Sequence, residues 1–227
     1  MQQEELPGPP DTSKDSDNNS FFLGLQYRYW WFIVLNMILT IIVFNFGCLG
    51  AKKWARQGED ISEWEGGLLY CNQCYSEWDE EHYNDVASDM SDLEGDLAEA
   101  MKTTFENLRD AGSVFVFFEL TALIMNLLWI ARVVFILMER KLGPNWLGFV
   151  PVAAGFVMHT VGLIAWTGIA DAGFEADCEE LNDGSDRRKV CSTYGAGLAV
   201  ITCILYIFFG AFYVFLYINR GRVAKEM

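Results

Sequence analysis

The chain has 227 residues, of which 52% are hydrophobic, and its mean hydropathy is +0.16. This composition is too apolar for an ordinary soluble domain, yet the net charge is −15. Nucleic acid is excluded as a plausible partner for such an acidic chain, whereas cations and basic protein patches are plausible partners.

Four apolar runs are longer than the roughly 18 residues that a bilayer span requires. Backbone groups in hydrocarbon must be satisfied within their own segment, so each run is expected to be a helix. The runs cover 32–50, 114–138, 146–170 and 195–218. The sequence therefore predicts a mainly α membrane protein: a four-helix bundle with a small extracellular β/α ectodomain formed by the first large loop.

These spans divide the chain into three parts. Residues 1–24 are expected to form a disordered cytoplasmic tail, 25–220 the tetraspan domain, and 221–227 a short cytoplasmic tail. No cleavable signal peptide is expected, because the first apolar run lacks a basic n-region and ends without an A-x-A site. The large loops, 51–113 and 171–194, hold most of the negative charge: residues 51–112 carry 16 acidic and 5 basic side chains, and 171–193 carry 7 and 3.

Basic residues do not decide the orientation, since six flank the spans on one side and eight on the other. The cysteines give a better indication. Four of the six fall in the two large loops, and an even number on one face suits an oxidising compartment. We therefore expect these loops outside the cell at the plasma membrane and both termini in the cytosol, so that the sequon at Asn18 stays unglycosylated. The four cysteines are Cys71, Cys74, Cys178 and Cys191.

Three pairings of these cysteines are possible, and Cys71–Cys74 with Cys178–Cys191 is the most local. A zinc site built from the same four residues is the alternative, because C-x-x-C is a common half-site. Disulfides are the favoured interpretation, and no metal ion is expected. Cys48 and Cys203 lie within the spans and are expected to be reduced packing residues.

The first large loop has two predicted parts. Residues 55–85 alternate glycine, aromatic and acidic positions and suggest short strands and turns. Residues 86–112 repeat apolar side chains at spacings of three and four, which predicts one amphipathic helix that leads into the second span and packs its stripe on the ectodomain.

Polar residues inside the spans are expected to face the bundle interior. They are Asn36, Asn45, Glu119, Asn126 and His159, with Thr40. Equal depth predicts two interhelical layers between the first two spans, one of Asn45 with Glu119 and one of Asn36 with Asn126. An ion path through Glu119 and His159 is the alternative, although one acid and one imidazole are few for a relay. Small residues in the third and fourth spans predict close helix packing: Ala153, Ala154, Gly155, Gly162 and Gly168 in the third, and Gly195, Gly197 and Gly210 in the fourth.

The layout resembles the claudin and peripheral-myelin-protein superfamily of tetraspans, which includes calcium-channel gamma subunits and lipoma-fusion-partner-like proteins. Its first-loop tryptophan, Gly-Leu-Trp-x-x-Cys motif and arginine before the second span correspond here to Trp54, Gly67, Leu68, Cys71 and Arg109. Leu69 stands where the motif has tryptophan, only two residues separate Cys71 from Cys74, and the carboxyl end lacks the terminal valine by which claudins dock PDZ domains.

The resemblance implies a non-enzymatic accessory or scaffold subunit that docks laterally on a larger membrane protein such as a channel or receptor. A claudin-like adhesion or barrier protein, assembled from same-family protomers and favouring cations, is the alternative; an ion-conducting pore is a third. The partners of an accessory subunit would be membrane lipid and the larger membrane protein on which it docks. Neither His82 nor His159 has a nucleophile at motif spacing, so we expect no enzyme, no catalytic residues and no cofactor.

Overall fold

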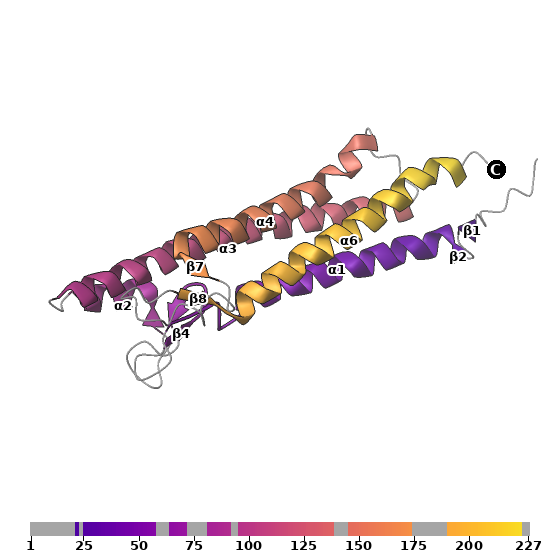
Figure 1. Ribbon diagram of the computed structural model, residues 1–227. Helices are drawn as coiled ribbons and strands as arrows, with labels where there is room; N and C mark the ends of the chain where they lie inside the picture. The colour runs from indigo at the N-terminus through magenta and orange to yellow at the C-terminus, as the bar shows by residue number, and fades with distance from the viewer. Residues whose placement is uncertain are drawn as a thin grey trace, which may run out of the picture.

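A computed structural model describes residues 21–22, 25–57, 64–71, 81–91, 95–138, 145–173 and 190–223. Four long helices dominate it (Figure 1): α1 (Tyr27–Gly50), α3 (Asp96–Leu137), α4 (Val150–Ala170) and α6 (Tyr194–Val223). Each is long and apolar enough to cross a membrane. The prediction of four helices of membrane-spanning length and hydrophobicity is thereby confirmed, and these helices indicate a multi-pass membrane protein.

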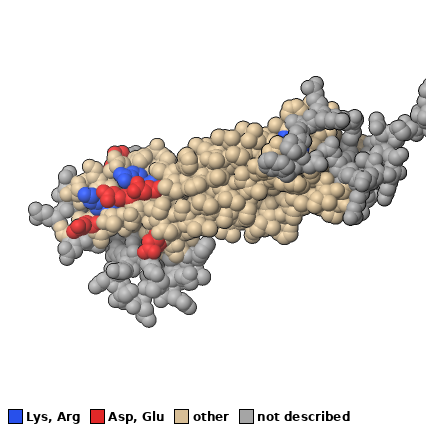
Figure 2. Space-filling model, turned by 90° about the horizontal axis from the view of Figure 1, so that it is seen from above, with Lys and Arg blue, Asp and Glu red and all other residues tan. Residues whose placement is uncertain are grey.

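The helices pack as a ring of four neighbours. α1 contacts α3 and α6, and α4 contacts the same two helices. Large apolar side chains stay exposed along all four helices, for example Phe46, Phe117, Ile164 and Phe208. Figure 2 shows the result on one face: an uncharged band along the middle of the molecule, with charged side chains gathered mainly at one end. This band has the surface of a protein solvated by lipid.

Small residues allow close helix packing at some of the predicted positions. A Cβ on Gly162 would lie 2.9 Å from the Cβ of Phe118 on α3, and one on Gly210 would lie 3.1 Å from Val152 on α4. In contrast, Gly168 and Gly197 face open space. The small-residue prediction is therefore right for α3–α4 and α4–α6 contacts and wrong for those two glycines.

A six-stranded sheet closes one end of the bundle. Its strands are β3 (Ala55–Gln57), β4 (Trp64–Gly66), β5 (Tyr70–Cys71), β6 (Glu81–His82), β7 (Ala172–Gly173) and β8 (Val190–Ser192), in the order β6-β5-β4-β3-β8-β7. All neighbours are antiparallel except β7 and β8. Short strands were expected over 55–85, but the expectation that the first loop alone forms the ectodomain is wrong, because β3 pairs with β8 of the second loop.

We call this end the sheet end. At the opposite end lie the C-terminal end of α6 and a hairpin of β1 (Phe21–Phe22) with β2 (Leu25–Gln26) (Figure 1). We call this the terminal end. The described parts of the two large loops thus share one end of the bundle, as their cysteines suggested. Of the predicted amino-terminal tail, residues 1–20 lie outside the described residues.

The helix predicted over 86–112 is divided in two. α2 (Tyr83–Ser91) ends before Gly95, whose φ of 133° is open to glycine and strained for other residues. α3 then runs without a break from Asp96 to Leu137. At 1.5 Å per residue its 42 residues span about 63 Å, roughly twice the 30 Å of a bilayer core. α3 is therefore longer than one bilayer crossing requires, and its first turns pack with α2 at the sheet end.

Candidate functional site

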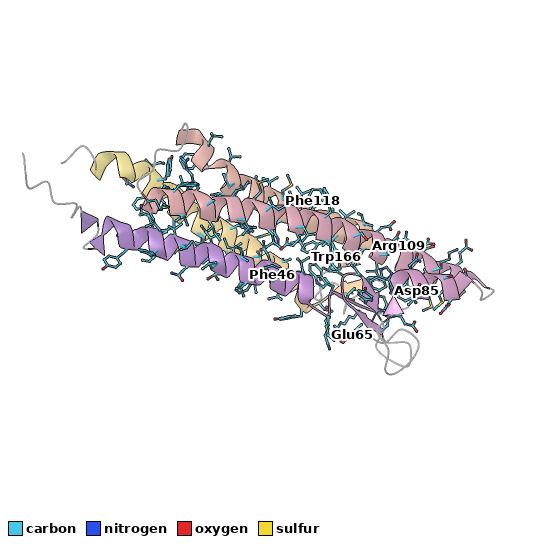
Figure 3. All side chains as sticks on the ribbon, turned by 180° about the vertical axis from the view of Figure 1, so that it is seen from behind. Phe46, Glu65, Asp85, Arg109, Phe118 and Trp166 are labelled. Carbon is cyan, nitrogen blue, oxygen red and sulfur yellow. The ribbon has the colours of Figure 1, made fainter. Side chains whose placement is uncertain are left out.

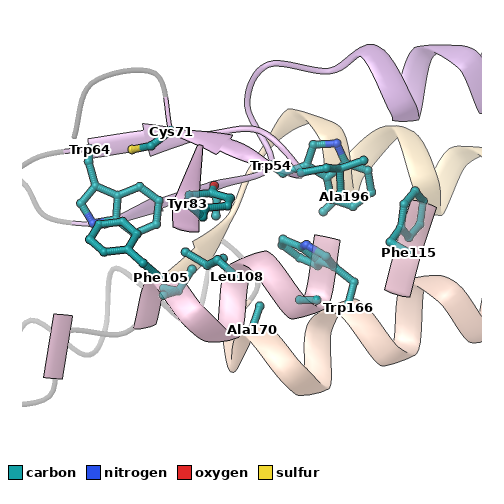
Figure 4. Close-up of a cluster of buried hydrophobic side chains, with 14 of the residues drawn as sticks. Trp54, Trp64, Cys71, Tyr83, Phe105, Leu108, Phe115, Trp166, Ala170 and Ala196 are labelled. Carbon is teal, nitrogen blue, oxygen red and sulfur yellow. The ribbon is translucent and has the colours of Figure 1, made fainter. Parts of the chain in front are cut away.

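Trp54 lies where the sheet meets the bundle, and its side chain is fully buried. Its indole Nε1 donates a hydrogen bond of 2.9 Å to the carbonyl of Cys48 at the end of α1. The ring packs against Phe115 on α3 and Trp166 on α4, with centroid distances of 4.6 and 5.0 Å. Figure 4 shows these three rings side by side. One side chain thus joins three helices.

The backbone around Trp54 adds the sheet and the fourth helix to this joint. The Trp54 N–H donates to Gly66 of β4 over 2.6 Å, and its carbonyl accepts from Thr193 over 2.9 Å. Gly195, in the first turn of α6, lies directly against the indole: a Cβ there would be 2.5 Å from two ring atoms. We call Trp54 with its ring, backbone and glycine contacts the Trp54 joint.

The Gly-Leu motif is built into the same region. The Gly67 carbonyl accepts a hydrogen bond of 2.9 Å from the buried hydroxyl of Tyr83 on α2. Burial raises the pKa of this phenol above its ordinary range. The Leu68 backbone touches α3 at Gly112, where a Cβ would overlap the Leu68 carbonyl. The motif therefore fastens β4 and β5 to α2 and α3.

Arg109 on α3 connects this helix to α2. Its guanidinium contacts the Asp110 carboxylate through Nε and Nη2, each at 2.8 Å. Nη1 donates to the Asn84 amide oxygen on α2 over 3.0 Å. Glu65, Asp85 and Arg109 lie at the sheet end, and Phe46 and Phe118 lie along the bundle (Figure 3). All five predicted motif residues therefore gather at or beside the junction of sheet and bundle.

The described cysteines fall into two groups. Cys48 and Cys203 are free thiols inside the bundle, as expected, whereas Cys71 and Cys191 are disulfide-bonded. Strands β4 and β3 stand between β5 and β8, which separates Cys71 from Cys191 by about 14 Å. This distance is too long for a direct bond between them. Cys74 and Cys178 lie outside the described residues, so their pairing stays a prediction.

Inside the bundle, Glu119 contacts His159. The carboxylate oxygen Oε2 lies 2.6 Å from the imidazole Nδ1, and both side chains are fully buried. The other imidazole nitrogen, Nε2, donates to the carbonyl of Ala199 over 2.9 Å. This arrangement links α3, α4 and α6, and it corrects the predicted pairing of Glu119 with Asn45.

A second polar contact lies deeper in the bundle, around Tyr206 of α6. The Asn45 and Asn126 amide nitrogens donate to its hydroxyl over 3.2 and 2.6 Å. A Cβ on Gly155 of α4 would lie 3.3 Å from the Tyr206 ring. Sequence reasoning missed Tyr206, although a tyrosine amid the apolar residues of the fourth span was a usable signal.

Asn36 does not join the second layer. Its side chain is exposed and donates to the Phe32 carbonyl of its own helix over 2.9 Å. Thr40 bonds its own helix in the same way. The prediction of two layers confined to the first two spans is thus wrong, because Glu119 meets a partner on α4, and Asn45 and Asn126 share a partner on α6.

Within the described ranges, no group of three or more His, Cys, Asp or Glu side chains is placed to hold a metal ion. His82 packs edge-on against Tyr70, and its Nδ1 accepts the Asn84 N–H over 3.2 Å.

These contacts hold the parts of the molecule in fixed positions. The Trp54 joint and the Gly67–Leu68 contacts fix the sheet and α2 to the bundle, and the polar contacts fix the bundle helices to one another. No family model and no curated protein matches this chain.

Proposed function

We propose that this chain is a non-enzymatic membrane accessory subunit of the claudin and peripheral-myelin-protein type, which docks laterally on a larger membrane protein. The observation that carries this proposal is the Trp54 joint. Its contacts to α1, α3, α4, α6 and β4 make the ectodomain and the bundle one rigid body. A rigid surface that extends from the lipid to the outside loses less conformational entropy on docking than a tethered domain does.

The surface charge supports the same role. Exposed acids follow α2 and the first part of α3, including Asp85, Asp89, Glu99 and Asp110. These residues stand beyond the apolar band, where a partner's extramembrane part would meet them. A basic patch on that partner would be complementary and would speed and orient its docking.

Purification of the tagged chain from its native membrane in mild detergent tests the proposal. We expect a larger membrane protein to co-purify in fixed stoichiometry and to be lost at high salt. Replacing Asp85 and Asp89 by asparagine should weaken retention several-fold, because these charges face solvent and not the core. Ser88→Ala, on the same helix and also exposed, is the matched control and should retain the partner.

Two outcomes would contradict the accessory role. A chain that purifies alone at low salt has no such partner. Strands of self-assembled protein between expressing cells would instead support the adhesion role. The acidic sheet end is the observation that favours this second candidate, since opposed acidic surfaces would attract cations.

A further inference from the structure

The Glu119–His159 contact has a hydrogen-bond pattern that fixes its proton count. The Ala199 carbonyl can only accept, so the imidazole Nε2 that contacts it over 2.9 Å must carry a hydrogen. A second hydrogen must lie between Nδ1 and the Glu119 Oε2, because two acceptors would repel at 2.6 Å. Glutamic acid with neutral imidazole and glutamate with imidazolium both meet this requirement. Either way the pair shares one proton and is neutral overall.

Removing this proton would leave a net negative charge in the bundle. The second carboxylate oxygen of Glu119, Oε1, is buried and has no hydrogen-bond partner among the described residues. The buried polar residues of the described part include no lysine, arginine or second acid. An anion here would therefore lack both a counter-ion and a full set of donors, which is costly inside a membrane protein.

Adding another proton would leave a net positive charge with the same lack of compensation. The titratable groups that face the pair from other helices are Cys48 on α1 and Cys203 and Tyr206 on α6. None of these three groups is a fixed charge, because a thiol and a phenol are ordinarily neutral below pH 8. The folded bundle thus favours one bound proton over none or two.

We propose that Glu119 and His159 form a binding site for a single proton, which holds α3, α4 and α6 together and contributes most to the stability of the folded protein at mildly acidic pH. The site is not the relay of an ion path, since passing its proton on would create a buried charge. The site lies inside the bundle and involves no partner protein.

The pH dependence follows from the proton count of the unfolded chain. There the two groups titrate near ordinary pKa values of about 4.3 for glutamate and about 6.5 for histidine. Between these two pKa values the pair holds one proton in the unfolded chain as well, so the contribution of the pair to stability does not change with pH. Above pH 6.5 the unfolded chain loses its proton while the folded chain keeps it. The folded-to-unfolded ratio should then fall by about tenfold per pH unit.

Equilibrium unfolding in mixed detergent and SDS micelles between pH 5 and 8.5 tests this, with E119Q/H159Q as the reference for all other titrating groups. Glutamine at either position can keep an interhelical hydrogen bond. Relative to the reference, the wild-type ratio should be constant up to about pH 6.5 and fall about 100-fold by pH 8.5.

The single variants should give different profiles. In H159Q the buried acid stays protonated while its unfolded form does not, so stability should fall across the whole range. In E119Q the buried imidazole stays neutral, so stability should be constant above about pH 6.5 and fall about 30-fold by pH 5. A wild-type profile parallel to the reference above pH 6.5 would overturn the proposal. If the double variant does not fold, E119Q replaces it as the reference above pH 6.5, because its residue 159 contributes no pH dependence there.

Discussion

The Trp54 joint makes a sharp prediction about two glycines that are two residues apart on α6. Gly195→Ala places a Cβ 2.5 Å from the indole of Trp54, whereas Gly197→Ala places one in open space. Both substitutions replace glycine by the best helix former and gain up to about 1 kcal/mol in helix propensity. Any difference between them therefore measures the contact with Trp54.

The cost at Gly195 can be worked from what surrounds the indole. The ring must move about 1 Å to reach an ordinary contact distance of 3.5 Å or more. Phe115 and Trp166 pack against it, and its Nε1 donates to Cys48. Overpacking costs about 1–3 kcal/mol, and a buried donor without its acceptor costs about 1–3 kcal/mol. With both costs near the middle of their ranges and the helix gain subtracted, we expect Gly195→Ala to lose about 3 kcal/mol.

Thermal unfolding of the detergent-purified protein, followed by size-exclusion chromatography after heating, measures this loss. For a chain of this size, the midpoint should drop by about 5–15 °C in Gly195→Ala and stay level or rise slightly in Gly197→Ala. The cost of Gly195→Ala should be smaller in a Trp54→Phe background than in the wild type, because the smaller ring leaves room for the added Cβ. Equal midpoints for the two alanine variants would refute the argument that Trp54 is immobile.

Three further substitutions test other contacts in the same unfolding assay. Gly112→Ala should cost about 3 kcal/mol or more, because its Cβ would overlap the Leu68 carbonyl; an unchanged midpoint would show that the loop can move off α3. Tyr83→Phe should cost about 1 kcal/mol at neutral pH through the lost hydrogen bond to Gly67. Because burial raises the pKa of Tyr83, its contribution is complete below pH 10 and is lost as the pH rises further, so the wild type should lose more stability than Tyr83→Phe between pH 9 and 11. Asp171→Gly should raise stability by about 0.5–1 kcal/mol, since Asp171 has a left-handed φ of 48° at the end of α4.

The helices could be predicted from the sequence because the membrane imposes a local rule. An apolar run long enough to cross hydrocarbon must satisfy its own backbone, and this condition needs no knowledge of neighbours. The strand from 190 to 192 could not be found in the same way. Its pairing with β3 joins residues more than 130 positions apart, and a three-residue strand carries no periodic signal.

The break at Gly95 shows another limit. The apolar stripe of 86–112 keeps a helical period on both sides of it, so periodicity alone predicts a single helix. Only the glycine between the two halves signals the positive φ that ends one helix and starts the next. A glycine inside a helical pattern is tolerated often enough that its presence does not decide the matter.

The partners of the polar residues in the bundle were predicted wrongly for a different reason. A residue in a helix has a depth along the bundle and a direction around the helix axis, and the prediction used depth alone. Asn45 and Glu119 are near one level, but a helix presents each residue in a direction that advances by about 100° per position. Glu119 faces α4 and meets His159, while Asn45 faces α6 and meets Tyr206. Direction is fixed by which helices are neighbours, and α1 and α4, which lie across the ring, each contact both α3 and α6. Asn36 shows the consequence most clearly: its direction leads out of the bundle, so it bonds its own backbone instead. Depth can therefore select the polar residues of a membrane bundle, but only the order of the helices around the ring can select their partners.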